Sequence, residues 1–442
     1  MEPDLQVRLS EAVGELRDAP ITPREKGFGL LSWSSPVSAA SLAQSRPWLF
    51  GGDFVWPLMV LRESALANNI TSLASYCAAA GVKHAPHGKT TMAPQLVARQ
   101  LRAGAWAVTA ANVSQVQLFR SFGMTRILIA NEVTDRAALG WLATELAANP
   151  EFECYSFVDS LAGVALLDGT LRAGGLAPGP ADSGPQLRVL VELGRPGGRA
   201  GCRSVDDAVI VAKAAAAAPA LRLAGAAGYE GAIGHDDSAA TLAAVAEFCR
   251  DLRRVGEQIA GLPGCRDGYL LSAGGSAYFD VVVRELTAPG NGGPAPTVVL
   301  RSGAYISYDH GFYGRIAPGT RPDRPGPHFM PAFELWAAVL SRPEPGLAIV
   351  GAGRHHVAFD QDMPVPLRIR PADGPPADAT GMHVSSVDDQ HAYLRLPPDS
   401  SLAPGDLVCM GISHPCTTFD KWRVIPVVDD EYHVIDAIHT FF

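Results

Sequence analysis

The chain has 442 residues, of which 47% are hydrophobic and 18% are charged, so it can bury one large core and one smaller core. Its formal net charge of −9 argues against a nucleic-acid partner, because neutralising phosphates requires clustered Lys and Arg. The most apolar stretch, residues 205–228, is interrupted by Lys213, Pro219 and Arg222, so we expect no membrane partner. Seven cysteines without disulfide-like spacing, and the lack of a signal-peptide pattern, predict a cytoplasmic protein.

The first regular pattern begins at Pro57. Residues 1–56 are treated as an N-terminal extension, a candidate for shaping substrate access or a subunit contact. A short strand at Leu58–Leu61 leads into a helix over residues 63–80, which Gly81 ends.

Short β-prone runs then alternate with helical runs, within a domain predicted over residues 57–315. The predicted strands are Val82–His87, Ala105–Thr109, Arg126–Ala130, Glu153–Val158, Gln186–Leu193, Leu221–Gly228, Gly268–Ser272 and Thr297–Arg301. The predicted helices between them include Thr91–Ala103, Ser114–Phe122, Asp135–Ala148 and Thr241–Ile259. Several strands are continuous apolar runs, which is typical of a parallel sheet buried on both faces. The alternation predicts a (β/α)8 TIM-type barrel, with a doubly wound open sheet as the competing interpretation.

After Gly303 the periodicity changes from helical to alternating, and prolines and glycines become dense. We predict a second, mainly β domain over residues 316–442. Its expected strands are Ala332–Leu340, Ala348–Gly351, His383–Asp388, Ala392–Leu396, Leu407–Ile412, Trp422–Val428 and Tyr432–Ala437. Short strands separated by turn signals are typical of a β sandwich or a small barrel.

Lys89 follows the first predicted barrel strand directly. Catalytic groups of such barrels lie at the carboxyl ends of the strands. The chain has only five lysines, which favours a specific role for one in this place. On these residues alone, the alternative is a capped and solvated turn that opens a helix.

Two glycine-containing loops follow the seventh and eighth predicted strands, at residues 272–276 (SAGGS) and 301–305 (RSGAY). Glycines let backbone N–H groups approach an anion, and a helix N-terminus adds its dipole. Each loop alone is weak evidence, because glycine-rich turns are common. Together they favour a phosphate site, since barrels often bind phosphate in the loops after these two strands.

A His-x-Cys pair follows the apolar run Leu407–Ile412, in the segment SHPC. If this segment is extended, the side chains of His414 and Cys416 point to the same side. An imidazole and a thiolate form a partial zinc site, and water or substrate could complete a catalytic metal shell. The alternative for a bare pair of this kind is a buried histidine near a buried free cysteine.

Six segments, taken in order, resemble the D-threonine aldolase / D-serine dehydratase family of fold-type III pyridoxal-phosphate (PLP) enzymes, which share an alanine racemase-like architecture. They are residues 84–91 (HAPHGKTT), 193–201 (LGRPGGRAG), 228–231 (GYEG), 272–276 (SAGGS), 303–305 (GAY) and 413–416 (SHPC). The first and the last are the specific ones, and the resemblance covers about Pro57 to Phe442. It implies a PLP- and metal-dependent lyase that acts on a small β-hydroxy D-amino acid and forms a homodimer.

The resemblance also implies roles for individual residues around the cofactor. Lys89 resembles the lysine that binds the cofactor covalently, Arg199 the arginine that contacts the ring oxygen, and Tyr229 a tyrosine that lines the pocket. The residues that resemble the phosphate-binding loops are Gly274, Gly275, Ser276, Gly303 and Tyr305.

Outside the cofactor loops, His414 and Cys416 match the metal pair, and Asp360 falls where related enzymes have an acidic residue near the substrate. The chain departs from many relatives at Gly88, where they carry alanine before the cofactor lysine. We expect this glycine to leave Lys89 in place and to loosen the turn.

Two reactions use the same groups. Elimination of the β-hydroxyl gives a keto acid and ammonia, whereas cleavage of the Cα–Cβ bond gives glycine and an aldehyde. A thiolate ligand favours Zn²⁺ and elimination, because the aldolases that carry this motif have a carboxylate there and a harder metal. We therefore predict a D-serine/D-threonine dehydratase, with D-threonine aldolase as the alternative reaction and Mn²⁺ as the alternative metal.

Two further function classes stay open on the sequence. A racemase would need a second base on the opposite face of the cofactor, and the sequence does not identify one. A non-catalytic PLP-binding protein of the same barrel would usually lack the second domain and the metal pair.

Overall fold

The computed structural model describes residues 3–176, 185–290, 294–320, 323–372 and 374–442. The chain forms two compact units. The barrel unit contains the N-terminal residues up to Leu9, Ala74–Lys89 and Gln100–Gly303, and the β unit contains Ser10–Leu73, Thr90–Arg99 and Ala304–Phe442. The domain boundaries predicted after residues 56 and 315 stay a prediction.

The described residues contain no disulfide and no helix that could span a membrane. All seven cysteines are free thiols. Within the described ranges, every helix is too short or too polar to cross a membrane.

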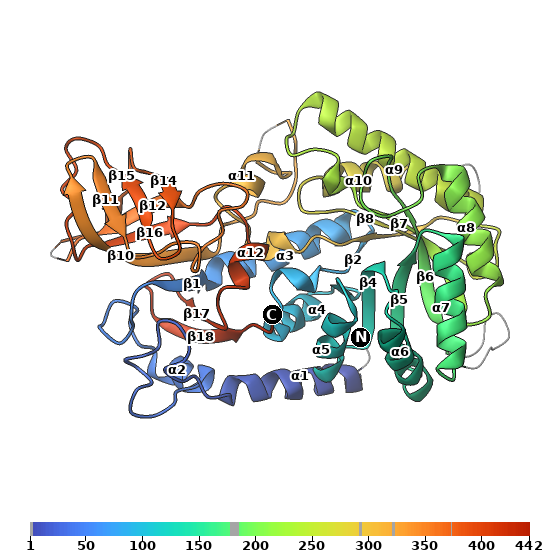
Figure 1. Ribbon diagram of the computed structural model, residues 1–442, viewed down its shortest axis with the longest axis horizontal. Helices are drawn as coiled ribbons and strands as arrows, with labels where there is room; N and C mark the ends of the chain where they lie inside the picture. Colours follow the sequence, from blue (N-terminus) through green and yellow to red (C-terminus); the bar gives the residue numbers. More distant parts are fainter. Residues whose placement is uncertain (1–2, 177–184, 291–293, 321–322, 373) are drawn as a thin grey trace. The chain divides into compact units, whose positions relative to one another are not determined.

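The barrel unit is built on a sheet of eight parallel strands in the order β2-β9-β8-β7-β6-β5-β4-β3 (Figure 1). The strands are β2 (Lys83–His84), β3 (Val108–Ala110), β4 (Arg126–Glu132), β5 (Glu153–Val158), β6 (Leu187–Leu193), β7 (Leu221–Gly228), β8 (Leu270–Ala273) and β9 (Thr297–Leu300). The two ends of this order also meet, because His87 forms a parallel bridge with Thr109, whose N–H donates to the Pro86 carbonyl at 2.8 Å. The predicted (β/α)8 barrel is therefore confirmed, and the open-sheet alternative is excluded.

Helices lie on the outside of these strands (Figure 1). Helices α3 (Glu63–Ala79) and α4 (Pro94–Arg102) come earlier in the chain and are divided between the two units. The outer helices of the barrel unit are α5 (Val113–Ser121), α6 (Arg136–Ala148), α7 (Leu161–Ala173), α8 (Val205–Ala217), α9 (Ala239–Ile259) and α10 (Phe279–Leu286). Five of them begin at a side chain that caps the first turn, and these N-cap residues are Asn112, Asp135, Ser160, Ser204 and Ser238. Each accepts a hydrogen bond from a backbone N–H that would otherwise lack a helical partner, which fixes where the helix starts.

The barrel interior is apolar in the middle and charged at the ends. Its buried centre contains Leu128, Tyr155, Phe157, Leu190 and Ala227. Side chains two positions apart share a face of a strand, so the rows of β4 and β6 continue past this centre to Glu132 and Glu192 at the carboxyl ends. At the amino ends, the carboxylate of Glu153 pairs with the guanidinium groups of Arg126 and, at 3.2 Å, Arg188.

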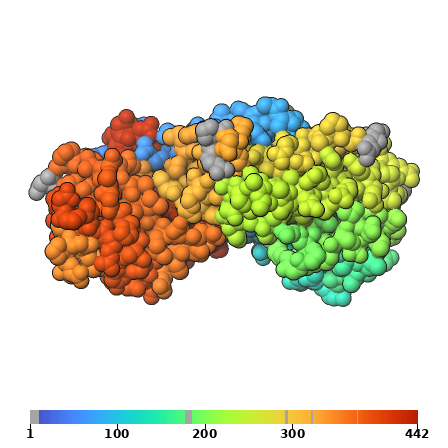
Figure 2. Space-filling view, turned by 90° about the horizontal axis from the view of Figure 1, so that it is seen from above, coloured from blue at the N-terminus to red at the C-terminus, as the bar shows by residue number. Residues whose placement is uncertain are grey.

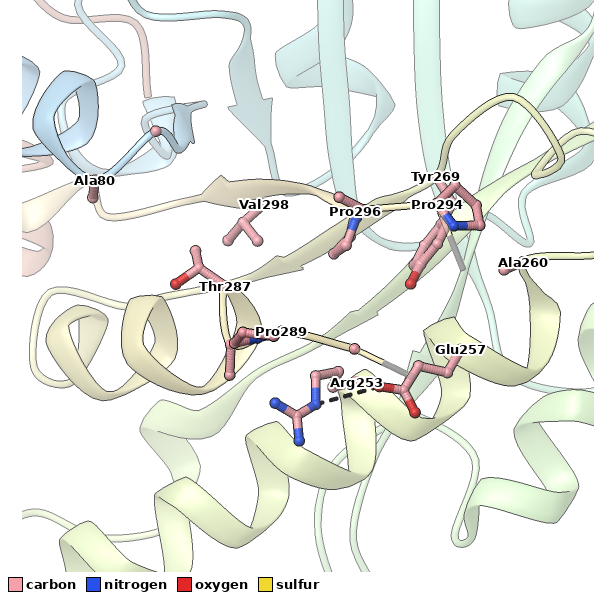
Figure 3. Close-up of a pocket in the computed structure, with 14 residues that line it drawn as sticks. Ala80, Arg253, Glu257, Ala260, Tyr269, Thr287, Pro289, Pro294, Pro296 and Val298 are labelled. Atoms are coloured by element: carbon pink, nitrogen blue, oxygen red, sulfur yellow. Dashed lines mark ion pairs between the residues drawn. The ribbon is translucent and has the colours of Figure 1, made fainter. Parts of the chain in front are cut away.

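A cavity of about 540 Å³ opens at the amino ends of β8 and β9, beside α9 and α10 (Figure 3). Tyr269, Val298 and the ion pair between Arg253 and Glu257, whose atoms are 3.6 Å apart, line it. Because barrel active sites lie at the carboxyl ends of the strands, this cavity is at the opposite end of β8 from the predicted phosphate loop.

The β unit is built on a mainly antiparallel sheet with the strand order β13-β12-β16-β10-β1-β17-β18, and β11, β14 and β15 extend it from β10. The bounds are β1 (Leu58–Arg62), β10 (Phe333–Glu344), β11 (Leu347–Val350), β12 (Val365–Arg370), β13 (Ala377–Asp378), β14 (His383–Val387), β15 (Ala392–Arg395), β16 (Leu407–Gly411), β17 (Val424–Val428) and β18 (Val434–His439). The C-terminal strands supply the orange and red surface of this unit in Figure 2. The predicted mainly β character of this region is confirmed.

The N-terminal extension has a structure that its sequence did not predict. It contains α1 (Pro3–Asp18) and α2 (Ala39–Ser45). Residues after α2 run beside the β17–β18 turn, where Leu49 N donates to the Tyr432 carbonyl at 2.9 Å. Lys26 Nζ donates to the carbonyls of His355 and Lys421, both at 2.8 Å, so most of the extension belongs to the β unit.

Candidate active site

Lys89 lies where the sequence places it, in the short 3-10 helix η1 (Gly88–Thr90) that follows β2. Its side chain is exposed. His87 is two residues earlier, and its Nδ1 atom is buried without a hydrogen-bond partner within the described residues. Burial, together with the charges of Lys89 and Arg301, holds the pKa of His87 well below its ordinary value. The lysine amine therefore stands near a neutral imidazole at the carboxyl end of β2.

Gly88 is required here by space and not by backbone conformation. A methyl group at this position would lie 2.8 Å from Cε2 of Phe119, closer still to its Cζ, and 3.1 Å from Cγ2 of Val108. Phe119 is a core residue of α5 with no exposed surface. The turn before Lys89 is thus packed tightly against an aromatic ring, which differs from the loosened turn that we expected.

The glycine loop after β8 is already hydrogen-bonded to a carboxylate. The N–H groups of Gly274 and Gly275 donate to the two oxygens of Glu230, at 3.0 and 2.6 Å. Gly274 has a φ of +96°, a conformation that favours glycine. The next residue, Ser276, is 4% exposed, and its Oγ has no hydrogen-bond partner within the described residues. The Ser276 hydroxyl of this loop can therefore bind an anion.

Arg301 brings a buried positive charge close to that loop. Its guanidinium donates to Ser272 Oγ and to the Gly228 carbonyl, both at 2.6 Å, and lies 5.4 Å from the ring centre of Phe157. Burial lowers the pKa of Arg301, and the nearby carboxylate of Glu230 opposes this effect. Sequence reasoning missed both Arg301 and Glu230, although Glu230 is part of the GYEG segment and Arg301 opens the RSGAY segment.

Arg199 and Tyr229 stack on each other beside a small cavity. The Arg199 guanidinium lies 5.4 Å from the Tyr229 ring centre, and its Nη2 lies 3.7 Å from Oε1 of Glu192. The cavity has a volume of about 320 Å³, and Glu192, Arg195, Arg199 and Tyr229 all line it. Tyr229 is 42% exposed, so its ring is available to a planar ligand.

The remaining predicted phosphate residues lie after β9. Gly303 is buried and is the last residue of the barrel unit. Tyr305 belongs to the β unit, in the 3-10 helix η3 (Ala304–Ile306). It is 1% exposed, and its ring centre lies 5.6 Å from that of Phe329.

The predicted metal pair, His414 and Cys416, lies on a turn and not on an extended strand. β16 ends at Gly411, and Cys416 opens the short helix α12 (Cys416–Phe419). The assumption of an extended segment was wrong, because Pro415 adopts the helical conformation that starts this turn. The two side chains still meet, since His414 is hydrogen-bonded to Cys416.

Asp360 orients His414. Its Oδ2 lies 2.7 Å from Nδ1 of His414, and its Oδ1 accepts a hydrogen bond from Thr417 Oγ1 at 2.7 Å. Burial works against a charged imidazole, but the contacts with Cys416 and Asp360 prevail and raise the pKa of His414 to about 9. A carboxylate on Nδ1 fixes the ring and leaves Nε2 for a metal, the usual arrangement around metal-binding histidines.

The donors of this turn fit a metal with an open coordination shell. His414 and Cys416 supply one nitrogen and one sulfur, which are zinc ligands. No group of three or more His, Cys, Asp and Glu side chains suitable for a metal occurs in the described residues, so water or substrate would complete the shell. Thr90 also reaches this turn, with its Oγ1 3.4 Å from Sγ of Cys416.

Comparisons with known proteins agree with the resemblance in the sequence. A family model described as "Putative serine dehydratase domain" matches residues 332–428. The chain is 28% identical over 324 residues to 3-hydroxy-D-aspartate aldolase of Paracoccus denitrificans (strain Pd 1222), covering 72% of this chain and 77% of the relative. It is 27% identical over 384 residues to D-threonine aldolase of Arthrobacter sp, covering 85% of this chain and 89% of the relative.

Solved structures show the same fold. D-threonine aldolase from Filomicrobium marinum superposes with a TM-score of 0.72 at 26% identity, covering 88% of this chain and 95% of that one. D-threo-3-hydroxyaspartate dehydratase from Delftia sp. HT23 superposes with a TM-score of 0.68 at 20% identity, covering 88% and 97%. Alanine racemase of Clostridium difficile 630 matches more weakly, with a TM-score of 0.56. The chain is therefore similar in sequence to D-threonine aldolase and 3-hydroxy-D-aspartate aldolase, and it has the alanine racemase-like fold.

Proposed function

We propose that the chain is a PLP- and metal-dependent lyase that acts on a small β-hydroxy D-amino acid, and that it releases a 2-keto acid and ammonia. D-Serine and D-threonine are the proposed substrates. The relatives support the substrate class, because their names describe aldolases and a dehydratase of β-hydroxy D-amino acids. We also propose that the chain acts as a homodimer.

The residues at the barrel mouth fit the proposed cofactor. Lys89 would hold it through an exposed amine, and Arg199 and Tyr229 would contact its ring. The Ser276 hydroxyl, which has no hydrogen-bond partner among the described residues, would bind its phosphate. When bound, PLP supplies an electron sink that stabilises negative charge at Cα of an amino acid. Lys89 would act as the base at Cα, and a base on one side of the cofactor would remove the Cα proton of one configuration.

The turn at residues 414–416, called the metal turn below, fits the proposed departure of the β-hydroxyl. A metal held by His414 and Cys416 supplies Lewis-acid assistance to the departure of the β-hydroxyl, a poor leaving group by itself. Asp360 and Thr417 keep the His414 ring in one orientation, through contacts of 2.7 Å each to the Asp360 carboxylate.

The observation that carries the proposal is the contact between Thr90 and Cys416. Thr90 follows Lys89 in the chain, and its hydroxyl lies 3.4 Å from the cysteine sulfur. Because consecutive Cα atoms are about 3.8 Å apart, connectivity alone keeps the lysine close to a residue that contacts a proposed metal ligand. This supports a joint role of the amine and the metal on one small substrate.

Elimination is favoured by the cysteine. A thiolate suits zinc, and structures of the related dehydratase include a cysteine-to-alanine mutant in a metal-free form. D-Threonine aldolase is the second candidate, because the relatives at 26–28% identity are aldolases and the dehydratase is 20% identical.

The test is incubation of the protein with PLP, Zn²⁺ and either D-serine or D-threonine, with keto acid, glycine and enantiomers all assayed. Pyruvate or 2-oxobutyrate supports elimination, whereas glycine with an aldehyde supports cleavage and overturns the dehydratase proposal. Appearance of the L-enantiomer would indicate a racemase. His414→Ala and Cys416→Ala should abolish turnover with zinc present and retain cofactor absorbance.

A matched control is His433→Ala. His433 also faces a carboxylate, with Nδ1 3.5 Å from Oδ2 of Asp429, but it lies on the β17–β18 turn. This variant should keep full activity. Full activity of the His414 or Cys416 variants would discard the metal proposal.

A further inference from the structure

We infer that Glu192, backed by Glu132, is a positioning residue that holds the guanidinium of Arg199 in place for the cofactor. This inference rests on the proposed function, since it concerns the residue that would contact the cofactor ring. The carboxyl groups of Glu132 and Glu192 lie at the carboxyl ends of β4 and β6, two strands that β5 separates in the sheet.

Glu192 is one of the most buried acids of the barrel. It is 3% exposed, and its Oε2 has no hydrogen-bond donor within the described residues. Its Oε1 lies 3.7 Å from Nη2 of Arg199, whose own side chain is 62% exposed. One end of the pair is thus fixed in the barrel interior, and the other projects into the cavity that Tyr229 also lines.

Glu132 lies beside Glu192 and interacts with it electrostatically. Two buried carboxyl groups this close are most stable when one of them is protonated. Burial and the neighbouring negative charge of Glu192 raise the pKa of Glu132 to about 8. At neutral pH Glu132 is therefore mostly protonated, so it adds no second negative charge beside the carboxyl group of Glu192 that faces Arg199.

The backbone of the loop that carries Arg199 is tied to the same place. The Cys202 N–H donates to the Glu192 carbonyl at 2.8 Å, and the Gly201 N–H donates to Oδ2 of Asp159 at 3.1 Å. Arg199 lies just before these two anchors in sequence. The main chain of the loop is held independently of the Glu192 side chain, so a substitution there changes the side-chain contact without releasing the loop.

Other charges surround this pair and must be considered with it. Asp159 follows β5, Arg301 follows β9, and Cys202 closes the loop after β6; each of them interacts electrostatically with Glu192 or Glu132. The positive charges of Lys89 and Arg199 both act on His87, which follows β2. Removing the charge of Glu192 makes this surrounding more positive, which disfavours protonation of a chromophore bound at Lys89.

The test is a pH titration of the visible absorbance of the PLP-loaded protein, with no substrate present. We expect Glu192→Gln to move the absorbance midpoint to lower pH, by about half a unit to one unit. Glu132→Gln keeps the charge on Glu192 and should move the midpoint little. The double variant, with both Glu132→Gln and Glu192→Gln, should shift the absorbance midpoint most. In Glu192→Gln alone, Glu132 can ionise and replace part of the lost negative charge. Glu192→Asp, which keeps a carboxylate, should lie close to the wild type.

The matched control is Glu153→Gln. Glu153 is a carboxylate of the same barrel interior at the amino end of β5, so the absorbance titration of this variant should follow that of the wild type. Equal midpoints in wild type and double variant overturn the inference, as does a shift in Glu132→Gln as large as in Glu192→Gln. If Lys89→Ala keeps the visible absorbance, or if the wild type shows none with PLP, the proposed function itself is contradicted and the role of Glu192 is discarded with it. Circular dichroism of each variant confirms folding, and Glu192→Asp keeps the test valid if Glu192→Gln does not fold.

Discussion

Replacing Gly88 by alanine should destabilise the barrel and displace Lys89, the proposed cofactor lysine. The new methyl group would lie 2.8 Å from Cε2 of Phe119 and nearer to its Cζ, whereas carbon atoms in contact prefer about 3.5–4.0 Å. Phe119 cannot retreat easily, because it is fully buried in α5. Overpacking of this kind costs about 1–3 kcal/mol.

Phe119→Leu should compensate for this substitution. Alone it leaves a small cavity and costs roughly 1–2 kcal/mol. Combined with Gly88→Ala, it makes room for the methyl group. The free energy of unfolding of the double variant should therefore be about 1 kcal/mol higher than the two single effects added together would give.

The assay is urea unfolding of the four proteins, followed by circular dichroism, with the fraction labelled at Lys89 measured after borohydride reduction with PLP. Gly140→Ala is the control, since a methyl group on this α6 residue meets no atom within 4 Å and should be neutral or slightly stabilising. The reasoning is refuted if Gly88→Ala is as stable as the wild type, or if the two substitutions are additive.

Three further predictions concern the metal turn and a buried histidine. Asp360→Asn removes the carboxylate that lies 2.7 Å from Nδ1 of His414, so zinc affinity, measured by competition with a chromophoric chelator, should fall about 10- to 100-fold; unchanged affinity would contradict the orienting role. Thr90→Val removes the hydroxyl 3.4 Å from the Cys416 sulfur and should weaken zinc binding about 2- to 10-fold in the same assay, with Thr90→Ser close to the wild type. Burial lowers the pKa of His84 to about 4, so the fold holds it neutral; its contribution to stability is complete above pH 6.5 and is lost as the pH falls towards 4. The urea midpoint should therefore drop less between pH 6.5 and 4 in His84→Gln than in the wild type, and parallel curves would count against this explanation.

The sequence by itself determined the elements and their order. Continuous apolar runs such as β4 and β6, separated by helices with capping residues, specify a parallel barrel because each signal is local to a few neighbouring residues. The loops after β2, β8 and β9 could be located for the same reason: a glycine, lysine or serine that ends a strand is visible in the chain itself. The segment SHPC likewise suggested a metal pair without knowledge of its conformation, and that role stays a prediction.

Only the tertiary structure decided which distant groups meet. β1 lies between β10 and β17, which are more than 250 residues away in the chain. The five residues of β1 carry no local signal that predicts these two partners. Glu230 binds the amides of Gly274 and Gly275, Asp360 reaches His414 across 54 positions, and Glu192 meets Glu132 across two strands. A carboxylate carries the same local signal whether it ends in solvent or against a buried donor, so its partner, its pKa and its role follow from burial and packing.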